Sequence, residues 1–150
     1  SPAIIRIAGV RLEGLRRGPG GARVFFEAMA TNLPDKPTLL WDGDCAFCAY
    51  WIRRWEKATA GAVEYRPCQE ALEDFPQVSE AECARAVQLV FPDGRVLSAA
   101  HAVLASLALA GRGRRLLAAY EHCGLFRRCA EAAYRFVARN RGWLPAGRRG

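Results

Sequence analysis

The sequence predicts a single α/β domain with a mixed four-stranded sheet, flanking helices and extra helices near its C-terminal end. Three observations lead to this prediction. An apolar run, Thr38 to Trp41, passes through a polar turn into a helical pattern. Two apolar runs between Val87 and Leu97 flank Pro92-Asp93-Gly94, which is the pattern of a hairpin. From Ala99 onward the apolar residues return at helical spacing. A chain of 150 residues that is 51% hydrophobic is long enough for one such core.

The first predicted strand is Thr38 to Trp41, and the first helix runs from about Cys45 to Ala58. Gly61 is the residue expected to end this helix, because glycine adopts the left-handed conformation of a helix end without strain. The predicted buried stripe of the helix has a four-residue spacing and consists of Phe47, Trp51 and Trp55. This pattern predicts a strand and a helix joined by the turn Asp42-Gly43-Asp44.

In the middle of the chain, the sequence predicts a second strand, a polar region and the hairpin. The second strand is Val63 to Arg66, and the polar residues 69–76 begin with a short helix. Ser79 and Glu82 have the spacing of a capping box, which predicts a helix through Arg85. The hairpin strands are expected at residues 87–91 and 95–97.

Three helices are predicted after the hairpin, at residues 99–110, 114–122 and 127–141. Their expected inner faces hold Val103, Leu104 and Leu107 in the first and Ala130, Ala133, Tyr134 and Val137 in the last. Gly111 and Gly124 are expected to interrupt the helices. A strand, a helix and a second strand, followed by a hairpin and closing helices, form a thioredoxin-like arrangement.

The net charge of +7 is unevenly distributed along the chain. Residues 112–150 carry ten Arg against two Glu, whereas residues 29–111 carry seven basic and eleven acidic side chains. No nucleic-acid motif or aromatic platform accompanies the basic residues, so we expect neither nucleic acid nor a membrane as a partner. The longest uncharged apolar run, 99–110, is shorter than a membrane-spanning helix.

The chain divides into an extension, a domain and a tail. The first 28 residues are interrupted by glycines, and the single methionine, Met29, stands just before the lead-in to the first strand. We therefore expect residues 1–28 to be a poorly ordered or non-native extension, 29–145 to be the domain and 146–150 to be a basic tail. No secretory signal precedes the cysteines, which predicts a cytoplasmic protein whose six cysteines are catalytic, metal-binding or buried thiols.

The residues with the clearest chemistry are Cys45 and Cys48. Their spacing places both sulfurs on one face of a first helical turn, at a separation that a disulfide can span. The unpaired N–H groups and partial positive charge of a helix N-terminus favour the thiolate form of a cysteine there. A strand that leads into such a helix predicts a redox site, and no cofactor is required.

Three segments together resemble the DCC family of predicted thiol-disulfide oxidoreductases. The first is D-G-D-C-x-F-C, with Asp42, Cys45 and Cys48; the second is the turn at residues 91–94; the third is the closing helix motif formed by Tyr134, Ala138, Asn140 and Arg141. The resemblance covers about residues 36–144 and implies a thioredoxin-like fold and a dithiol-disulfide activity. The cis-proline of better-known thioredoxin relatives has no counterpart here, since Ala84-Arg85-Ala86 precedes Val87.

These observations give a hypothesis for the roles of four residues. Cys45 is the attacking thiolate and Cys48 the resolving thiol, which exchange with a thiol- or disulfide-containing protein or small molecule. Asp44 caps the helix or transfers protons, and Asp42 relays protons to Cys48. The nearby carboxylates oppose the thiolate, so a reductant or isomerase is predicted more than a strong oxidant.

The remaining cysteines and two other functions form the alternatives. Cys83 is expected to be a small core residue, and Cys68 a buried one at a strand end. A zinc site would use Cys45 and Cys48 together with Cys68, Cys123 or a histidine. A haloacid-dehalogenase-like phosphatase would use Asp42 as nucleophile and Asp44 as acid/base, with a Lys and an acidic cluster for Mg²⁺.

Overall fold

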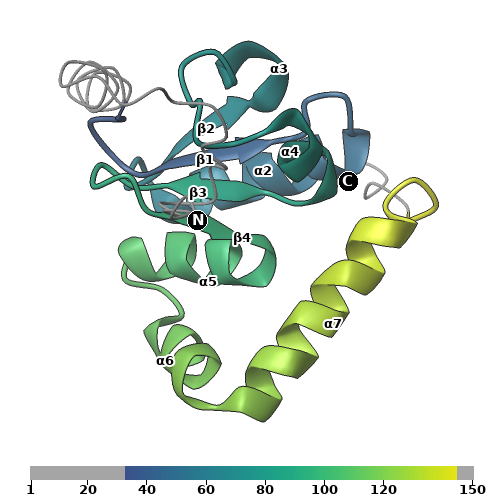
Figure 1. Cartoon of the computed structure of the whole chain (residues 1–150). Helices are drawn as coiled ribbons and strands as arrows, with labels where there is room; N and C mark the ends of the chain where they lie inside the picture. Colours follow the sequence, from purple (N-terminus) through teal and green to yellow (C-terminus); the bar gives the residue numbers. More distant parts are fainter. Residues whose placement is uncertain (1–32, 145–150) are drawn as a thin grey trace, which may run out of the picture.

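A computed structural model describes residues 33–144, which form a mixed four-stranded sheet covered by helices (Figure 1). The strands are β1 (Thr38–Trp41), β2 (Glu64–Pro67), β3 (Gln88–Val90) and β4 (Val96–Ser98), in the order β2-β1-β3-β4. β1 is parallel to β2 and antiparallel to β3, and β3 is antiparallel to β4. The predicted thioredoxin-like α/β fold is therefore confirmed.

Six helices accompany the sheet in the described part of the chain. They are α2 (Ala46–Thr59), α3 (Cys68–Ala71), α4 (Glu80–Arg85), α5 (Ala99–Leu109), α6 (Arg114–His122) and α7 (Gly124–Asn140). The capping box predicted at Ser79 and Glu82 is present at the start of α4. None of these helices has the length and apolar character needed to cross a membrane.

The central strand β1 places its side chains alternately in two cores, as a strand must. Leu39 packs with Leu89 of β3, Ile52 of α2 and the small residues of α5. Leu40 packs on the other face, against α3, α4 and the segment between them. Both leucines are completely buried. The sheet is thus the middle of three layers, with α2 and α5 on one side and α3 and α4 on the other.

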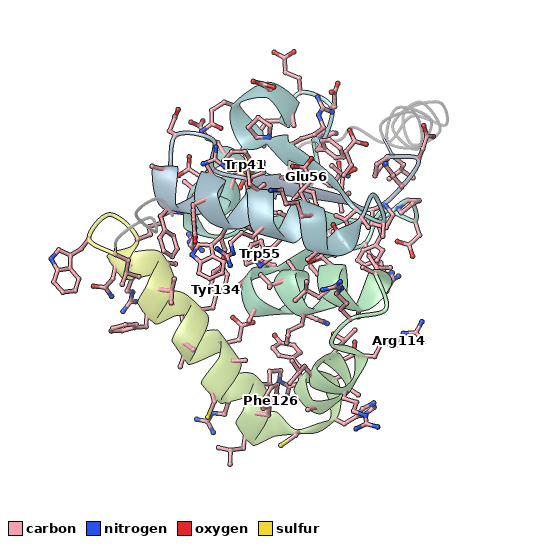
Figure 2. All side chains as sticks on the ribbon, turned by 180° about the vertical axis from the view of Figure 1, so that it is seen from behind. Trp41, Trp55, Glu56, Arg114, Phe126 and Tyr134 are labelled. Atoms are coloured by element: carbon pink, nitrogen blue, oxygen red, sulfur yellow. A yellow bond between two sulfur atoms is a disulfide. The ribbon has the colours of Figure 1, made fainter. Side chains whose placement is uncertain are left out.

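The C-terminal helices α6 and α7 extend the fold beyond the sheet. α7 packs against α5 and α6, and then runs back toward the sheet (Figure 1). Tyr134 lies in the middle of α7 (Figure 2). Its hydroxyl accepts a hydrogen bond of 3.0 Å from the backbone N–H of Val87. This contact fixes α7 to the residue just before β3, so the end of α7 is held near the start of α2.

The predicted buried stripe of α2 is wrong in its centre. Ile52 and Thr59 are the buried residues of this helix, whereas Trp51 is 39% exposed. Phe47 and Trp55 each contact the Trp51 ring, and the Arg54 guanidinium lies over the same ring. The aromatic residues therefore form a ridge along one edge of the buried face, because a strict four-residue spacing drifts around a helix with 3.6 residues per turn.

Two predictions for the later helices also need correction. The most buried residues of α5 include Ala102, Ala105 and Ser106, and the predicted inner-face leucines are only partly buried. α6 ends at His122 as predicted, but the break lies at Cys123, and α7 begins at Gly124, three residues before its predicted start. On the inner face predicted for α7, Tyr134 is half-buried but Val137 is 38% exposed.

The structure joins Cys68 and Cys83 in a disulfide, which the sequence did not predict. Both residues are buried, as expected, but they are not free thiols. Cys68 opens α3 directly after β2, and Cys83 lies in α4, so the bond links the two helices on one face of the sheet. The predicted extension at residues 1–28 and tail at 146–150 lie outside the described residues.

Candidate active site

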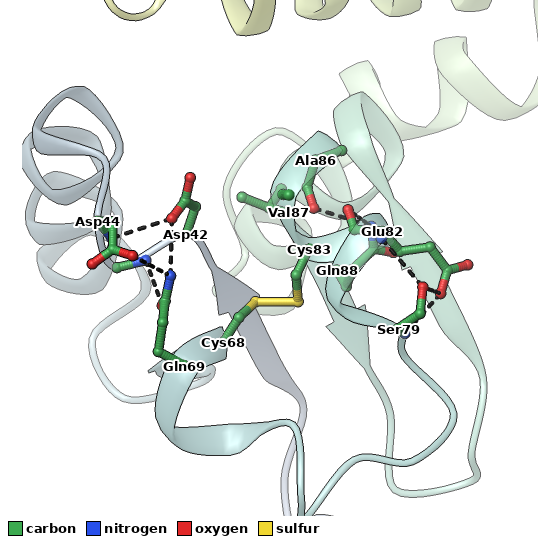
Figure 3. The surroundings of a disulfide bond; sticks show 12 residues. Asp42, Asp44, Cys68, Gln69, Ser79, Glu82, Cys83, Ala86, Val87 and Gln88 are labelled. Atoms are coloured by element: carbon green, nitrogen blue, oxygen red, sulfur yellow. Dashed lines mark hydrogen bonds between the residues drawn. A yellow bond between two sulfur atoms is a disulfide. The ribbon is translucent and has the colours of Figure 1, made fainter.

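The turn between β1 and α2 is built by its own side chains and by one distant residue, Gln69. The Asp44 N–H donates to Asp42 Oδ1 at 3.1 Å, and the Cys45 N–H donates to the Asp42 carbonyl at 3.2 Å. Gln69 accepts from the Gly43 N–H at 2.9 Å and donates to the Asp42 and Asp44 carboxylates at 3.1 and 3.2 Å (Figure 3). One amide thus holds both carboxylates of the turn.

Gly43 is required in this turn for steric reasons. A Cβ atom there would lie 2.8 Å from Gln69 Oε1 and 2.9 Å from Pro67 Cβ. The glutamine tip can move, but the proline ring at the end of β2 cannot, so Gly43→Ala is expected to displace the turn. We expect a loss of about 1–3 kcal/mol in the free energy of unfolding, typical of overpacking, and slower disulfide exchange.

Urea denaturation of Gly43→Ala measures this loss, with Gly124→Ala as the matched control. No atom lies within 4 Å of a Cβ added at Gly124. A Gly43→Ala variant as stable and as active as Gly124→Ala would contradict the expected displacement.

Cys45 is the N-cap residue of α2, and its sulfur takes part in the cap. The Cys45 Sγ accepts a hydrogen bond of 3.2 Å from the backbone N–H of Cys48. This bond gives a partner to one of the backbone N–H groups that the first turn of a helix leaves unpaired. The suggested capping by Asp44 is wrong, because that carboxylate accepts from Gln69 while Cys45 provides the cap.

Cys48 lies one turn deeper and is held in its neutral form. Burial, the hydrogen bond to Cys45 and the charge of Cys45 raise the pKa of the Cys48 thiol to about 12, while Arg141 lowers it. Both cysteines are half-buried and free. The two sulfurs therefore have different environments. In the fully reduced protein, Cys48 remains a thiol at neutral pH.

Arg141, directly after α7, reaches into the site from the far end of the chain. Its Nη1 lies 3.6 Å from Cys48 Sγ, and its Nη2 lies 2.7 Å from the carbonyl oxygen of Ala84 and 3.5 Å from Asp42 Oδ2. Sequence reasoning did not select Arg141 or Gln69 as site residues. Arg141 was visible only as the last residue of the closing helix motif, and Gln69 had no signal.

A hollow of about 600 Å³ lies between the start of α2 and the end of α7. Its lining includes Asp42, Asp44, Cys45, Phe47 and Arg141. Among the described residues, Cys45 lines this hollow and Cys48 does not. The hollow therefore lies against the sulfur-bearing residue at the start of α2.

The raised pKa of Cys48 predicts a loss of stability at alkaline pH. The unfolded thiol has its ordinary pKa of 9.0, whereas the folded thiol has a pKa of about 12. The contribution of this thiol to stability is therefore complete below pH 9.0 and is lost as the pH rises toward about 12. Between these values the free energy of unfolding of the reduced wild type should fall faster than that of Cys48→Ala. An equal decline in both, measured by denaturation in excess reductant, would be inconsistent with the raised pKa.

The other cysteines do not complete a metal site. Cys68 is bound to Cys83, whereas Cys123 and Cys129 are exposed and free. Within residues 33–144, no three His, Cys, Asp or Glu side chains are grouped as metal ligands would be. The zinc alternative would use the Cys68 sulfur as a third ligand, but this sulfur is bonded to Cys83.

The phosphatase alternative also lacks support from the geometry. Its lysine would have to approach Asp42, but Lys36 precedes β1 and lines a separate hollow with Thr38, at the opposite end of that strand. Asp42 itself pairs with Arg141 and Gln69. The partners that the structure gives to the carboxylates of the turn are thus Arg141 and Gln69 and not Lys36.

A mixed sheet with a Cys-x-x-Cys pair at the start of the helix after β1 defines a thioredoxin-like protein with a dithiol site. Comparison with protein families agrees with this class. The model of the DCC1-like thiol-disulfide oxidoreductase family matches residues 39–145, so the chain belongs to this family. No curated protein and no solved structure matches the chain.

Proposed function

We propose that the protein exchanges a dithiol for a disulfide through Cys45 and Cys48, with Cys45 as the attacking residue. The observation that carries this proposal is the asymmetry of the pair. Cys45 caps α2 with its sulfur and lines the hollow, whereas burial and its neighbour keep Cys48 protonated. The accessible sulfur suits the first attack, and the protected one suits the second.

The exchange takes place in two displacements. The Cys45 thiolate attacks a substrate disulfide R–S–S–R′, forms a mixed disulfide Cys45–S–S–R and releases R′–S⁻, which takes up a proton. Cys48 then loses its proton and attacks Cys45 Sγ, so that R–S⁻ leaves and the Cys45–Cys48 disulfide forms. Two electrons pass from the dithiol to the substrate, and the reverse sequence oxidises a substrate dithiol.

The two carboxylates have supporting roles in this proposal. Asp44 holds the turn through Gln69, and Asp42 holds both Gln69 and Arg141. The recorded contacts lead from Asp42 to Cys48 through Arg141, a side chain that stays protonated. Asp42 would therefore influence Cys48 through charge and position, and it would accept a proton only from a group in the hollow.

The proposal is tested by trapping the mixed disulfide. A Cys48→Ser variant stops after the first displacement and should accumulate disulfide-linked partners on Cys45, which mass spectrometry identifies. The matched control is Cys45→Ser/Cys48→Ser, in which Cys123 and Cys129 remain as the free thiols. Partners linked equally to both variants would show that the exposed cysteines react instead, and the proposed roles would then be wrong.

A further inference from the structure

We propose that Arg141 is a catalytic residue of the second displacement, where its guanidinium stabilises the Cys48 thiolate that attacks the mixed disulfide. This inference rests on the proposed roles of Cys45 and Cys48. It concerns the timing of the reaction: Cys48 stays protonated while Cys45 is a free thiolate and becomes reactive once Cys45 is bonded to the substrate.

The geometry places one fixed positive charge beside the resolving sulfur. Arg141 Nη1 donates to Cys48 Sγ at 3.6 Å. The carbonyl of Ala84 and the carboxylate of Asp42 hold the same guanidinium from two other segments. Its side chain is 26% exposed, so its field is less screened than that of a surface arginine.

The groups around Cys48 explain why its reactivity changes during the reaction. Cys45 is hydrogen-bonded to this thiol, the charge of Cys48 acts on Tyr134, and Asp42 pairs with the Arg141 guanidinium. Burial raises the pKa of Cys48, and Cys45 raises it further through its hydrogen bond and its charge. Once Cys45 is in a mixed disulfide it carries no charge, so both of its contributions disappear. Burial still opposes the thiolate, but Arg141 now lowers the pKa of Cys48 without opposition from Cys45.

The expected effect of removing the charge follows from two general relations. An opposite charge at this range lowers a pKa by about 1–3 units. Each unit raises the thiolate fraction about tenfold, but the thiolate becomes less nucleophilic as its pKa falls, which leaves a gain of about 3.5-fold per unit. The second displacement should therefore slow between about 4-fold and about 40-fold when Arg141 becomes neutral.

The experiment follows both displacements in one reaction. The reduced protein, with Cys123 and Cys129 replaced by serine, is mixed with the uncharged probe 2,2′-dipyridyl disulfide, and release of pyridine-2-thione is recorded by stopped flow. The first phase reports attack by Cys45, and the second reports its displacement by Cys48. Arg141→Gln removes the charge but keeps an amide that can donate to the Ala84 carbonyl. Arg141→Lys keeps the charge, and Arg135→Gln, on the exposed side of α7, is the matched control.

The proposal predicts that Arg141→Gln slows the second phase much more than the first and moves its pH profile to higher pH. Arg141→Lys should restore a large part of the rate, and Arg135→Gln should match the parent protein. An unchanged second phase in Arg141→Gln would overturn the role of Arg141, as would equal slowing in the Gln and Lys variants. A parent protein with no second phase would instead disprove the exchange through Cys45 and Cys48.

Discussion

A Cys45→Ser variant is expected to lose disulfide exchange by at least about a thousandfold, since removal of a nucleophile leaves only the contribution of binding. Serine keeps the size of the side chain and the ability to cap α2, so the fold should survive. The neighbouring Cys48 cannot replace the lost thiolate in the first attack, because Cys45 lines the hollow and Cys48 does not. The measurement is the initial rate of reaction with 2,2′-dipyridyl disulfide in the background that lacks Cys123 and Cys129.

Cys48→Ser is the control for this prediction. It retains the first displacement and should release a single equivalent of pyridine-2-thione per protein chain. If Cys45→Ser reacted at the parent rate while Cys48→Ser did not react, the two cysteines would have the opposite roles.

Loss of the Cys68–Cys83 disulfide is expected to have the largest effect on stability. The two cysteines are 15 residues apart, and closure of a loop of that length removes about 3 kcal/mol of chain entropy from the unfolded state. The Cys68→Ala/Cys83→Ala variant should therefore have a free energy of unfolding about 3 kcal/mol lower than the wild type. It should also exchange disulfides more slowly, because Gln69, which holds the Asp42–Asp44 turn, follows Cys68 directly (Figure 3).

Urea denaturation under oxidising conditions measures this difference, with Cys129→Ala as a control at an exposed, free cysteine. The wild type in excess reductant should approach the stability of the double variant. Equal unfolding midpoints for the wild type and the double variant would refute a stabilising role for this bond.

The part of the site that could be predicted from the sequence is the part built by neighbouring residues. Asp42, Cys45 and Cys48 are close in the chain, and a strand followed by a helix with Cys-x-x-Cys at its start already defines their arrangement. The parallel pairing of β1 with β2 and the hairpin of β3 and β4 also follow from local patterns and short connections.

The residues that sequence reasoning missed reach the site from distant segments. Gln69 has no distinctive spacing, and Arg141 appears in the sequence only as the last residue of the closing helix motif. Both contact the site because α3 and the end of α7 pack beside the turn. Tyr134 is named in the sequence as an inner-face residue and a motif member, but its contact is also a distant one, since its hydroxyl accepts from the Val87 N–H. That N–H is the main-chain donor just before β3, and because it donates to Tyr134 it is not free to donate to another group.

The disulfide was missed because the cysteines were judged by the expected cellular compartment and not by their positions in the fold. Cys68 and Cys83 have no shared motif, and the expected cytoplasmic location argued against a structural disulfide. Their approach depends on how α3 and α4 pack against Leu40 and Val90 on one face of the sheet. Such packing is a tertiary property, which the spacing of two cysteines does not specify.

The most direct test of the central claim is the redox state of each cysteine across a series of glutathione buffers, read by alkylation and peptide mapping. The proposed exchange predicts that Cys45 and Cys48 change together from two free thiols to one intramolecular disulfide, reversibly and as a two-electron couple. Cys48→Ser should instead show glutathione attached to Cys45. If Cys45 and Cys48 stayed reduced across the whole series, or paired with other cysteines, the central claim would be contradicted.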